Sequence, residues 1–187
     1  PLNRHLHGDG VAPAELAAEA HPQRAPAGLI ISYGTQPSAV GQGYPHTPGL
    51  NIDAQVECWR LVADAVNVKG GTIVAQLMHV GRISHPSLIG QRPVAPSAIR
   101  PAGEVYTEQG MQRFERPRAY ETAELPGVID EFVTAARNAI AAGLDGVELH
   151  AANGYLLQQF LSDSTNQRTD TYGGSPVNRA RFVIEVA

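Results

Sequence analysis

Short apolar runs alternate with helical patterns along this chain, and the alternation constrains the fold more than any other sequence feature. The runs 29–32, 72–77 and 147–149 are short enough to be buried strands. Segments in which apolar residues recur at helical spacing lie between these runs. Strands separated by helices form parallel crossovers, so the sequence predicts an α/β architecture.

The first two helices are expected between residues 13 and 70. Residues 13–25 contain good helix formers, and Pro22 should end or kink the helix that they form. A second helix should begin near Asn51 or Asp53, because either side chain can cap it. Its apolar residues recur at helical spacing up to Val66.

Two more helices are expected in the second half of the chain. The third covers about residues 126–142, and Gly143 is well placed at its C-terminal end. The fourth should start at Ser175 as the N-cap, with Pro176 at the first helical position, and continue to the end of the chain.

These elements correspond to half of a TIM barrel, (β/α)8. Residues 1–4 would end one further strand, which gives about the first four βα units of a fold that typically needs about 250 residues. An open doubly wound sheet is the alternative, but its glycine fingerprint is absent after the first strand. We therefore expect residues 1–187 to be the N-terminal half of one barrel domain. A loop or capping segment should be inserted at about residues 84–123.

Composition excludes several classes of protein. The formal net charge is −4, whereas a chain that binds nucleic acid needs a basic surface. No apolar run approaches the roughly eighteen residues of a membrane helix. The single cysteine, Cys58, cannot form an internal disulfide and is typical of a reducing compartment. We therefore expect a cytoplasmic protein that binds neither nucleic acid nor membrane.

Candidate site residues lie at or just after the end of each expected strand. They include Asn3 after the first strand, Gly34 after the second, Gln76 and His79 at the third, and the segment 150–155 after the fourth. The C-terminal ends of barrel strands surround the active site in this class of fold. These residues are therefore expected to converge on one site.

The segment 150–155 has the most informative chemistry. His150 and Asn153 can aim two N–H donors at one oxygen and so stabilise negative charge on a carbonyl. Tyr155 carries a phenol that stays protonated near neutral pH and can donate a proton to a neighbouring carbon. The spacing alone is equally compatible with His150 and Asn153 bonding local backbone and Tyr155 packing in the core.

Several segments together resemble the Old Yellow Enzyme family of flavin ene-reductases. The strongest matches are HAANGYLLQQFLS at 150–162, NQRTDTYGGS at 166–175 and NRAR at 178–181. Further matches in the family's order are PLNR at 1–4, GLIIS at 28–32, GYPHTPGL at 43–50 and QLMHVGRISH at 76–85. The resemblance covers essentially the whole chain.

This resemblance implies a (β/α)8 barrel that binds FMN and takes its reducing equivalents from NAD(P)H. His150 and Asn153 would bind the carbonyl or nitro oxygen of the substrate, and Tyr155 would protonate Cα after hydride from flavin N5 reaches Cβ. Tyr44 would line the substrate cavity. The implied cofactor-binding residues are Pro1, Leu2, Asn3, Gly34, Gln76 and His150.

Other features of the resemblance bear on site composition. Asn3 stands where many members carry Thr or Cys beside flavin O4. Because the residue at this position tunes the reduction potential of the flavin, the resemblance does not define that potential for this chain. Arg168 and Asp170 match family positions and are interpreted as partners that fix a loop. The spacing of His79 and His85 fits no usual zinc pattern, so no metal site is expected.

The resemblance also implies partners and leaves alternatives open. Family members are roughly twice as long, so the C-terminal half of the barrel is an expected partner, and a second copy of the chain is another. The substrate would be a small enone or nitro compound. One alternative is an inactive, truncated half-barrel that binds no cofactor by itself. Others are a nitro-ester reductase of the same family and a dienoyl-CoA reductase relative, whose usual iron–sulfur cluster a single cysteine does not support.

Overall fold

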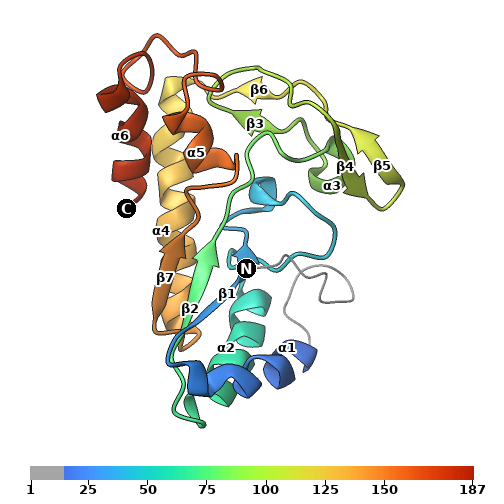
Figure 1. The fold of residues 1–187 in the computed structure, drawn as a ribbon, viewed down its shortest axis with the longest axis vertical. Coiled ribbons are helices and arrows are strands. Elements are labelled where there is room, and N and C mark those ends of the chain that lie inside the picture. Colours follow the sequence, from blue (N-terminus) through green and yellow to red (C-terminus); the bar gives the residue numbers. More distant parts are fainter. Residues whose placement is uncertain (1–14) are drawn as a thin grey trace.

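A three-stranded parallel sheet forms the centre of the fold. The computed structural model describes residues 15–187, and Figure 1 shows their arrangement. Strands β1 (Ile30–Thr35), β2 (Ile73–Leu77) and β7 (Gly146–Leu149) are ordered β1-β2-β7, with β2 in the middle. These are the three strands expected from the apolar runs, and β1 extends further than expected, to Thr35. The strand expected at residues 1–4 lies outside the described residues.

Two amphipathic helices cover one face of this sheet. Helix α2 (Asp53–Asn67) and helix α4 (Leu125–Ala141) pack against it, and their Trp59 and Phe132 side chains are fully buried in one apolar cluster with Ile73 and Leu77 of β2. Burial of this cluster stabilises the fold because it removes large apolar surfaces from water. Helix α6 (Pro176–Val186) packs against α4 and against the short helix α5 (Leu156–Leu161). The Phe160 and Phe182 rings stack between α5 and α6 with centroids 4.1 Å apart.

The opposite face of the sheet differs from the helix-covered face in its exposure to solvent. Paired residues of parallel strands point to the same face, which places Ile31 beside Val74 and Gln76 beside Glu148. Ile31 is 40% exposed, whereas the helix-covered Ile73 is fully buried. Within residues 15–187 the strands do not close into a barrel, because β1 and β7 are each paired along one edge only. An unclosed parallel sheet with helices on one face agrees with the α/β half-barrel expected from the sequence, in which only part of the strands of a TIM barrel is present.

The ends of the first helices depend on individual residues. Helix α1 (Glu15–Ala20) stops before a 3-10 helix (Pro22–Ala27), which confirms the break expected at Pro22. The prediction that Asn51 or Asp53 caps α2 is wrong, because Ile52 occupies the N-cap position and offers no polar side chain. Instead, Oε1 of Gln55 accepts from the backbone N–H groups of Asn51 (2.7 Å) and Ile52 (3.3 Å). The exposed amides at this helix start are thus satisfied from within the first turn.

The ends predicted for the later helices are confirmed. Gly143 follows α4 with a φ of +86°, a conformation that glycine adopts without the strain of a Cβ. Oγ of Ser175 accepts from the backbone N–H of Asn178 at 3.2 Å, and Pro176 is the first residue of α6. No helix in residues 15–187 has the length and apolar character needed to cross a membrane.

The segment between β2 and α4 contains small elements of its own. Helix α3 (Pro86–Ile89) precedes β3 (Val94–Ala95), which pairs in parallel with β6 (Arg118–Ala119). Strands β4 (Glu104–Thr107) and β5 (Gly110–Arg113) form an antiparallel hairpin, and a 3-10 helix (Thr122–Glu124) leads into α4. Figure 1 shows this segment beyond the C-terminal ends of the sheet strands. We call residues 84–123 the insertion.

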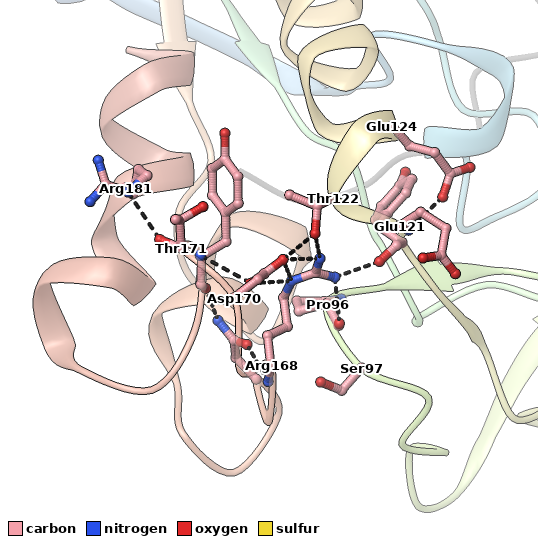
Figure 2. Close-up of polar contacts among 12 residues, drawn as sticks. Pro96, Ser97, Glu121, Thr122, Glu124, Arg168, Asp170, Thr171 and Arg181 are labelled. Carbon is pink, nitrogen blue, oxygen red and sulfur yellow. Dashed lines mark hydrogen bonds and ion pairs between the residues drawn. The ribbon is translucent and has the colours of Figure 1, made fainter.

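Arg168 fastens the insertion to the loop that follows α5 (Figure 2). Its guanidinium donates to the carbonyl oxygens of Pro96 (3.1 Å) and Tyr120 (2.5 Å) and to Oγ1 of Thr122 (3.1 Å). It also pairs with the Asp170 carboxylate at 2.5 Å. The hydrogen bonds from Arg168 hold the pKa of Asp170 down at about 2. The interpretation of Arg168 and Asp170 as loop-fixing partners is therefore confirmed.

Candidate active site

The expected site residues from β1, β2 and β7 lie at the C-terminal ends of these strands. Tyr44 belongs to the loop after β1, and Tyr155 is the N-cap residue of α5, after β7. Their hydroxyl oxygens are 3.0 Å apart, within hydrogen-bond distance. The rings of His150 and Tyr155 meet edge to face, with centroids 5.1 Å apart. The structure thus brings Tyr44, His150 and Tyr155 together as the sequence predicts.

A tight turn places Asn153 beside His150. Asn153 has a φ of +56°, and asparagine is one of the few residues with a side chain that tolerates this left-handed conformation. Nδ2 of Asn153 lies 3.5 Å from Nε2 of His150. The alternative in which Tyr155 packs in the core does not hold, because Tyr155 is half-buried. The local backbone contact that this alternative expects of His150 is present, from the N–H of Ala152.

The His150 tautomer follows from its backbone partner. The N–H of Ala152 donates to Nδ1 of His150 at 3.4 Å, so a neutral ring carries its proton on Nε2. Burial lowers the pKa of His150, and the nearby Glu148 carboxylate opposes this effect. The neutral ring therefore presents an N–H donor next to the amide donor of Asn153. One oxygen placed between these two donors would accept from both.

The Tyr44 hydroxyl is protonated throughout the neutral range. Burial raises the pKa of Tyr44 well above its ordinary value, and the hydrogen bond with Tyr155 raises it further. When Tyr44 donates to Tyr155, the hydroxyl proton of Tyr155 is free to point toward a bound molecule. Thr47 contributes to the loop geometry, because its hydroxyl donates to the carbonyl oxygen of Tyr44 at 3.0 Å.

Gln76 is positioned to meet a flat polar ligand. It is buried in β2, and Gly34 of β1 lies beside it in the register. Because Gly34 has no side chain, a ligand can approach the β1 backbone next to the Gln76 amide. Nε2 of Gln76 donates to Oε1 of Glu148 at 2.5 Å, so Oε1 of Gln76 is the acceptor that this amide can offer to a ligand. These groups fit one polar edge of a flavin ring. The predicted cofactor residues Pro1, Leu2 and Asn3 lie outside the described residues.

Glu148 is a residue of this site that was not predicted from the sequence. Its signal was an acidic residue within an apolar strand, two positions before His150. Only the pairing of β2 with β7 reveals that Glu148 lies directly beside Gln76. Glu148 therefore contacts Gln76 of β2 and lies two residues before His150 in the chain.

The two other histidines near this end of β2 have local partners. His79 is buried, and its Nδ1 accepts from the backbone N–H of Gly81 at 3.0 Å. Nδ1 of His85 accepts from the N–H of Ser87 at 3.2 Å and so caps α3. In the part of the chain that the structure describes, no group of three potential metal-binding side chains comes together.

Comparison with known proteins identifies relatives over almost the whole chain. The sequence profile of the NADH:flavin oxidoreductase / NADH oxidase family matches residues 3–187. 12-Oxophytodienoate reductase 1 of Oryza sativa is 44% identical over 189 residues, which covers 100% of this chain and 48% of that protein.

Solved structures give the same result. The old yellow enzyme homologue from Zymomonas mobilis superposes with a TM-score of 0.97 and 46% identity, covering 100% of this chain and 52% of that one. Morphinone reductase superposes with a TM-score of 0.94 and 47% identity, again over 100% of this chain and 52% of the other.

The matches cover the whole of this chain but only part of each relative. The chain spans about half the length of the relatives that it matches. Its open sheet has the fold of the N-terminal half of their TIM barrels. The chain therefore belongs to the NADH:flavin oxidoreductase / NADH oxidase family, the family of Old Yellow Enzyme, and corresponds to its N-terminal region.

Proposed function

We propose that this chain carries the substrate-binding and proton-donating part of an FMN-dependent, NAD(P)H-oxidising ene-reductase. The substrates are α,β-unsaturated carbonyl or nitro compounds. The observation that carries the proposal is the 3.0 Å contact between the hydroxyls of Tyr44 and Tyr155, next to the donor pair of His150 and Asn153. A proton donor beside an oxygen-binding site is the arrangement that conjugate reduction requires.

His150 and Asn153 bind the oxygen of the substrate. Their two N–H donors are close enough to share one acceptor, and negative charge grows on that oxygen when the conjugated system is reduced. Polarisation of the carbonyl or nitro group by these donors makes Cβ electrophilic. Because burial keeps the His150 ring neutral, its Nε2–H acts as a hydrogen-bond donor rather than as an acid.

Tyr155 delivers the proton to Cα. Tyr44 remains protonated and can donate to the Tyr155 oxygen, which stabilises that oxygen as its own proton leaves. The edge-to-face contact with His150 restricts the orientation of the Tyr155 ring. Proton delivery is thus controlled by side chains from the loop after β1 and from the turn after β7.

Gln76 and Gly34 hold the FMN ring at the end of β2. When bound, FMN would supply the hydride for Cβ and would draw its electrons from NAD(P)H. The Gln76 amide binds the pyrimidine edge of the ring, and the backbone at Gly34 allows close approach. By the resemblance, Pro1, Leu2 and Asn3 add further contacts to the cofactor.

The C-terminal half of the barrel is the proposed partner of this chain. The outer edge of β7 and the sheet face that bears the half-exposed Ile31 are unpaired within residues 15–187. Further parallel strands would satisfy this edge and cover this face. The same open edge supports the alternative function, in which the chain alone binds no cofactor.

A visible absorption spectrum of the chain, mixed with FMN and then desalted, tests the proposal. A retained flavin band, shifted from that of free FMN, is expected if the site assembles. A colourless protein after desalting would contradict cofactor binding by this chain and favour the alternative. The same measurement on Gln76→Leu shows whether any retained flavin occupies the proposed site.

A further inference from the structure

The direction of the Gln76 amide is determined by a single neighbour. Nε2 of Gln76 donates to Oε1 of Glu148 at 2.5 Å, across the pair of strands β2 and β7. A carboxylate can only accept hydrogen bonds, so the nitrogen of the amide, and not its oxygen, must face Glu148. Gln76 is 5% exposed, which leaves water little room to compete for this bond.

This bond decides what Gln76 offers to a ligand. The amide nitrogen has two protons, and Glu148 takes one of them. The second proton and the carbonyl oxygen Oε1 remain for a molecule on the same face of the sheet. An adjacent donor and acceptor in one plane match an imide edge, in which an N–H lies next to a carbonyl group.

We infer that Glu148 is a positioning residue, which fixes the Gln76 amide so that it presents an acceptor and a donor to the imide edge of a bound flavin. This inference rests on the proposed function for the identity of the ligand. The orientation of the amide is independent of that function, because it follows from the contact between Gln76 and Glu148. Without Glu148, the amide can rotate by 180° and present its two groups in the reverse order.

Glu148 also faces the substrate side of the site. Its carboxylate lies two residues before His150 on β7, close enough to influence the charge of the ring. One side chain therefore contacts the amide that meets the cofactor and lies near the imidazole that meets the substrate. Four residue pairs of the backbone register already join β2 to β7. The hydrogen bond between Glu148 and Gln76 is therefore not needed to hold these two strands together.

Nuclear magnetic resonance of the Gln76 side-chain amide tests the orientation without any ligand. The signals are assigned by their loss in Gln76→Ala. In the unmodified chain, one Nε2 proton is expected to exchange with water at least about tenfold more slowly than its partner, as a hydrogen bond to a charged acceptor predicts. In Glu148→Leu, this difference is expected to vanish. An undiminished difference in Glu148→Leu would overturn the inference.

A conservative variant guards against misfolding. Glu148→Gln has nearly the same shape but can donate as well as accept, so it does not impose one direction on Gln76. If Glu148→Leu does not fold, protection of the slow proton in Glu148→Gln is expected to fall at least about threefold. No fall in Glu148→Gln would then overturn the inference.

The affinity for FMN, measured by quenching of flavin fluorescence, tests the consequence for the ligand. Glu148→Leu is expected to weaken binding about tenfold. The matched control is Glu185→Gln on α6, whose carboxylate accepts from the Tyr172 hydroxyl far along the chain from the site, and it should bind FMN normally. Equal affinities of the unmodified chain and Glu148→Leu would overturn the role toward flavin. Failure of the unmodified chain to bind FMN would contradict the proposed function, while the amide exchange still decides the orientation.

Discussion

The hydroxyl oxygens of Tyr44 and Tyr155 lie 3.0 Å apart, although 111 positions separate these residues in the sequence. The loop after β1 brings Tyr44 to this place, and the N-terminus of α5 brings Tyr155. The pair is half-buried, so its hydrogen bond is stronger than it would be in bulk water. Two hydroxyls held in this way can support one another as one of them gives up a proton.

Under the proposed function, Tyr155→Phe should therefore separate the two half-reactions of the FMN-loaded protein. Loss of a positioned general acid is expected to slow alkene-dependent reoxidation about 100-fold or more, while flavin reduction by NAD(P)H is unchanged. Tyr44→Phe should slow the same step about tenfold, because it removes only the supporting hydrogen bond. Stopped-flow absorbance at the flavin band measures both steps. Equal slowing of the two steps by Tyr155→Phe would contradict its role as proton donor.

His150→Ala should weaken binding of an oxygen ligand at the same site. A phenol is a suitable probe, since its oxygen can accept from both donors. Removing one of two donors to this oxygen is expected to raise the dissociation constant about tenfold. Spectral titration of the FMN-loaded enzyme with phenol measures the affinity, and Asn153→Ala should give a loss of similar size. An unchanged titration in His150→Ala would show that the oxygen binds elsewhere.

Arg168→Lys should destabilise the attachment of the insertion. The Arg168 side chain is only 8% exposed and bonds two carbonyls, a hydroxyl and a carboxylate, whereas lysine cannot reproduce its planar set of donors. The free energy of unfolding is expected to fall by about 2–3 kcal/mol, because acceptors lose their partners. Urea unfolding followed by circular dichroism measures this change.

Arg116→Lys is the matched control for this prediction. Arg116 also lies in the insertion, but it is exposed and makes one hydrogen bond, to the carbonyl of Ala98. Its substitution should change the unfolding free energy by less than about 0.5 kcal/mol. Equal effects of the two substitutions would mean that Arg168 contributes only its charge.

Local sequence patterns were sufficient for the three strands of the central sheet, for most helix ends and for the residues at the end of β7, but not for the short strands β3 to β6 of the insertion. These features depend on neighbours in the chain, such as Pro22 before the 3-10 helix or Ser175 before α6. The expected half-barrel agrees with the three parallel strands of the described residues, and its fourth strand, at residues 1–4, lies outside them. The N-cap of α2 was predicted wrongly. Oε1 of Gln55, and not the side chain of Asn51 or Asp53, accepts from the backbone N–H groups at the start of the helix, and this outcome depends on side-chain geometry.

Contacts between distant segments were the harder part of the site to predict. The contact of Glu148 with Gln76 can be recognised only when β2 and β7 are known to pair, since the two residues lie 72 positions apart. The contact between Tyr44 and Tyr155 likewise depends on two loops from different strands. His79 and Tyr120 belong to the same class, with 41 positions between them and a contact of 3.5 Å.

His79 should make the stability of the protein depend on pH. Burial lowers the pKa of His79 to about 3, from 6.5 in an unperturbed ring. As the pH falls below 6.5, His79 binds a proton in the unfolded chain, whereas in the folded chain it stays neutral down to about pH 3. Stability is therefore highest above pH 6.5 and is lost as the pH falls. The slope from this residue should approach about 1.4 kcal/mol per pH unit.

His79→Asn tests this assignment, because its Oδ1 can still accept from the Gly81 N–H while the ionisable ring is gone. The unfolding free energy is measured in urea between pH 7.5 and 4.5. It should depend less steeply on pH in the variant, because unfolding then takes up about one proton fewer. This range lies above the pKa of about 2 of Asp170, so the clamp at Arg168 stays intact during the measurement. Burial also lowers the pKa of His21, whose contribution remains in both proteins. Identical slopes would show that the folded protein protonates His79 at Nδ1, which would require the contact of Nδ1 with the Gly81 N–H to open.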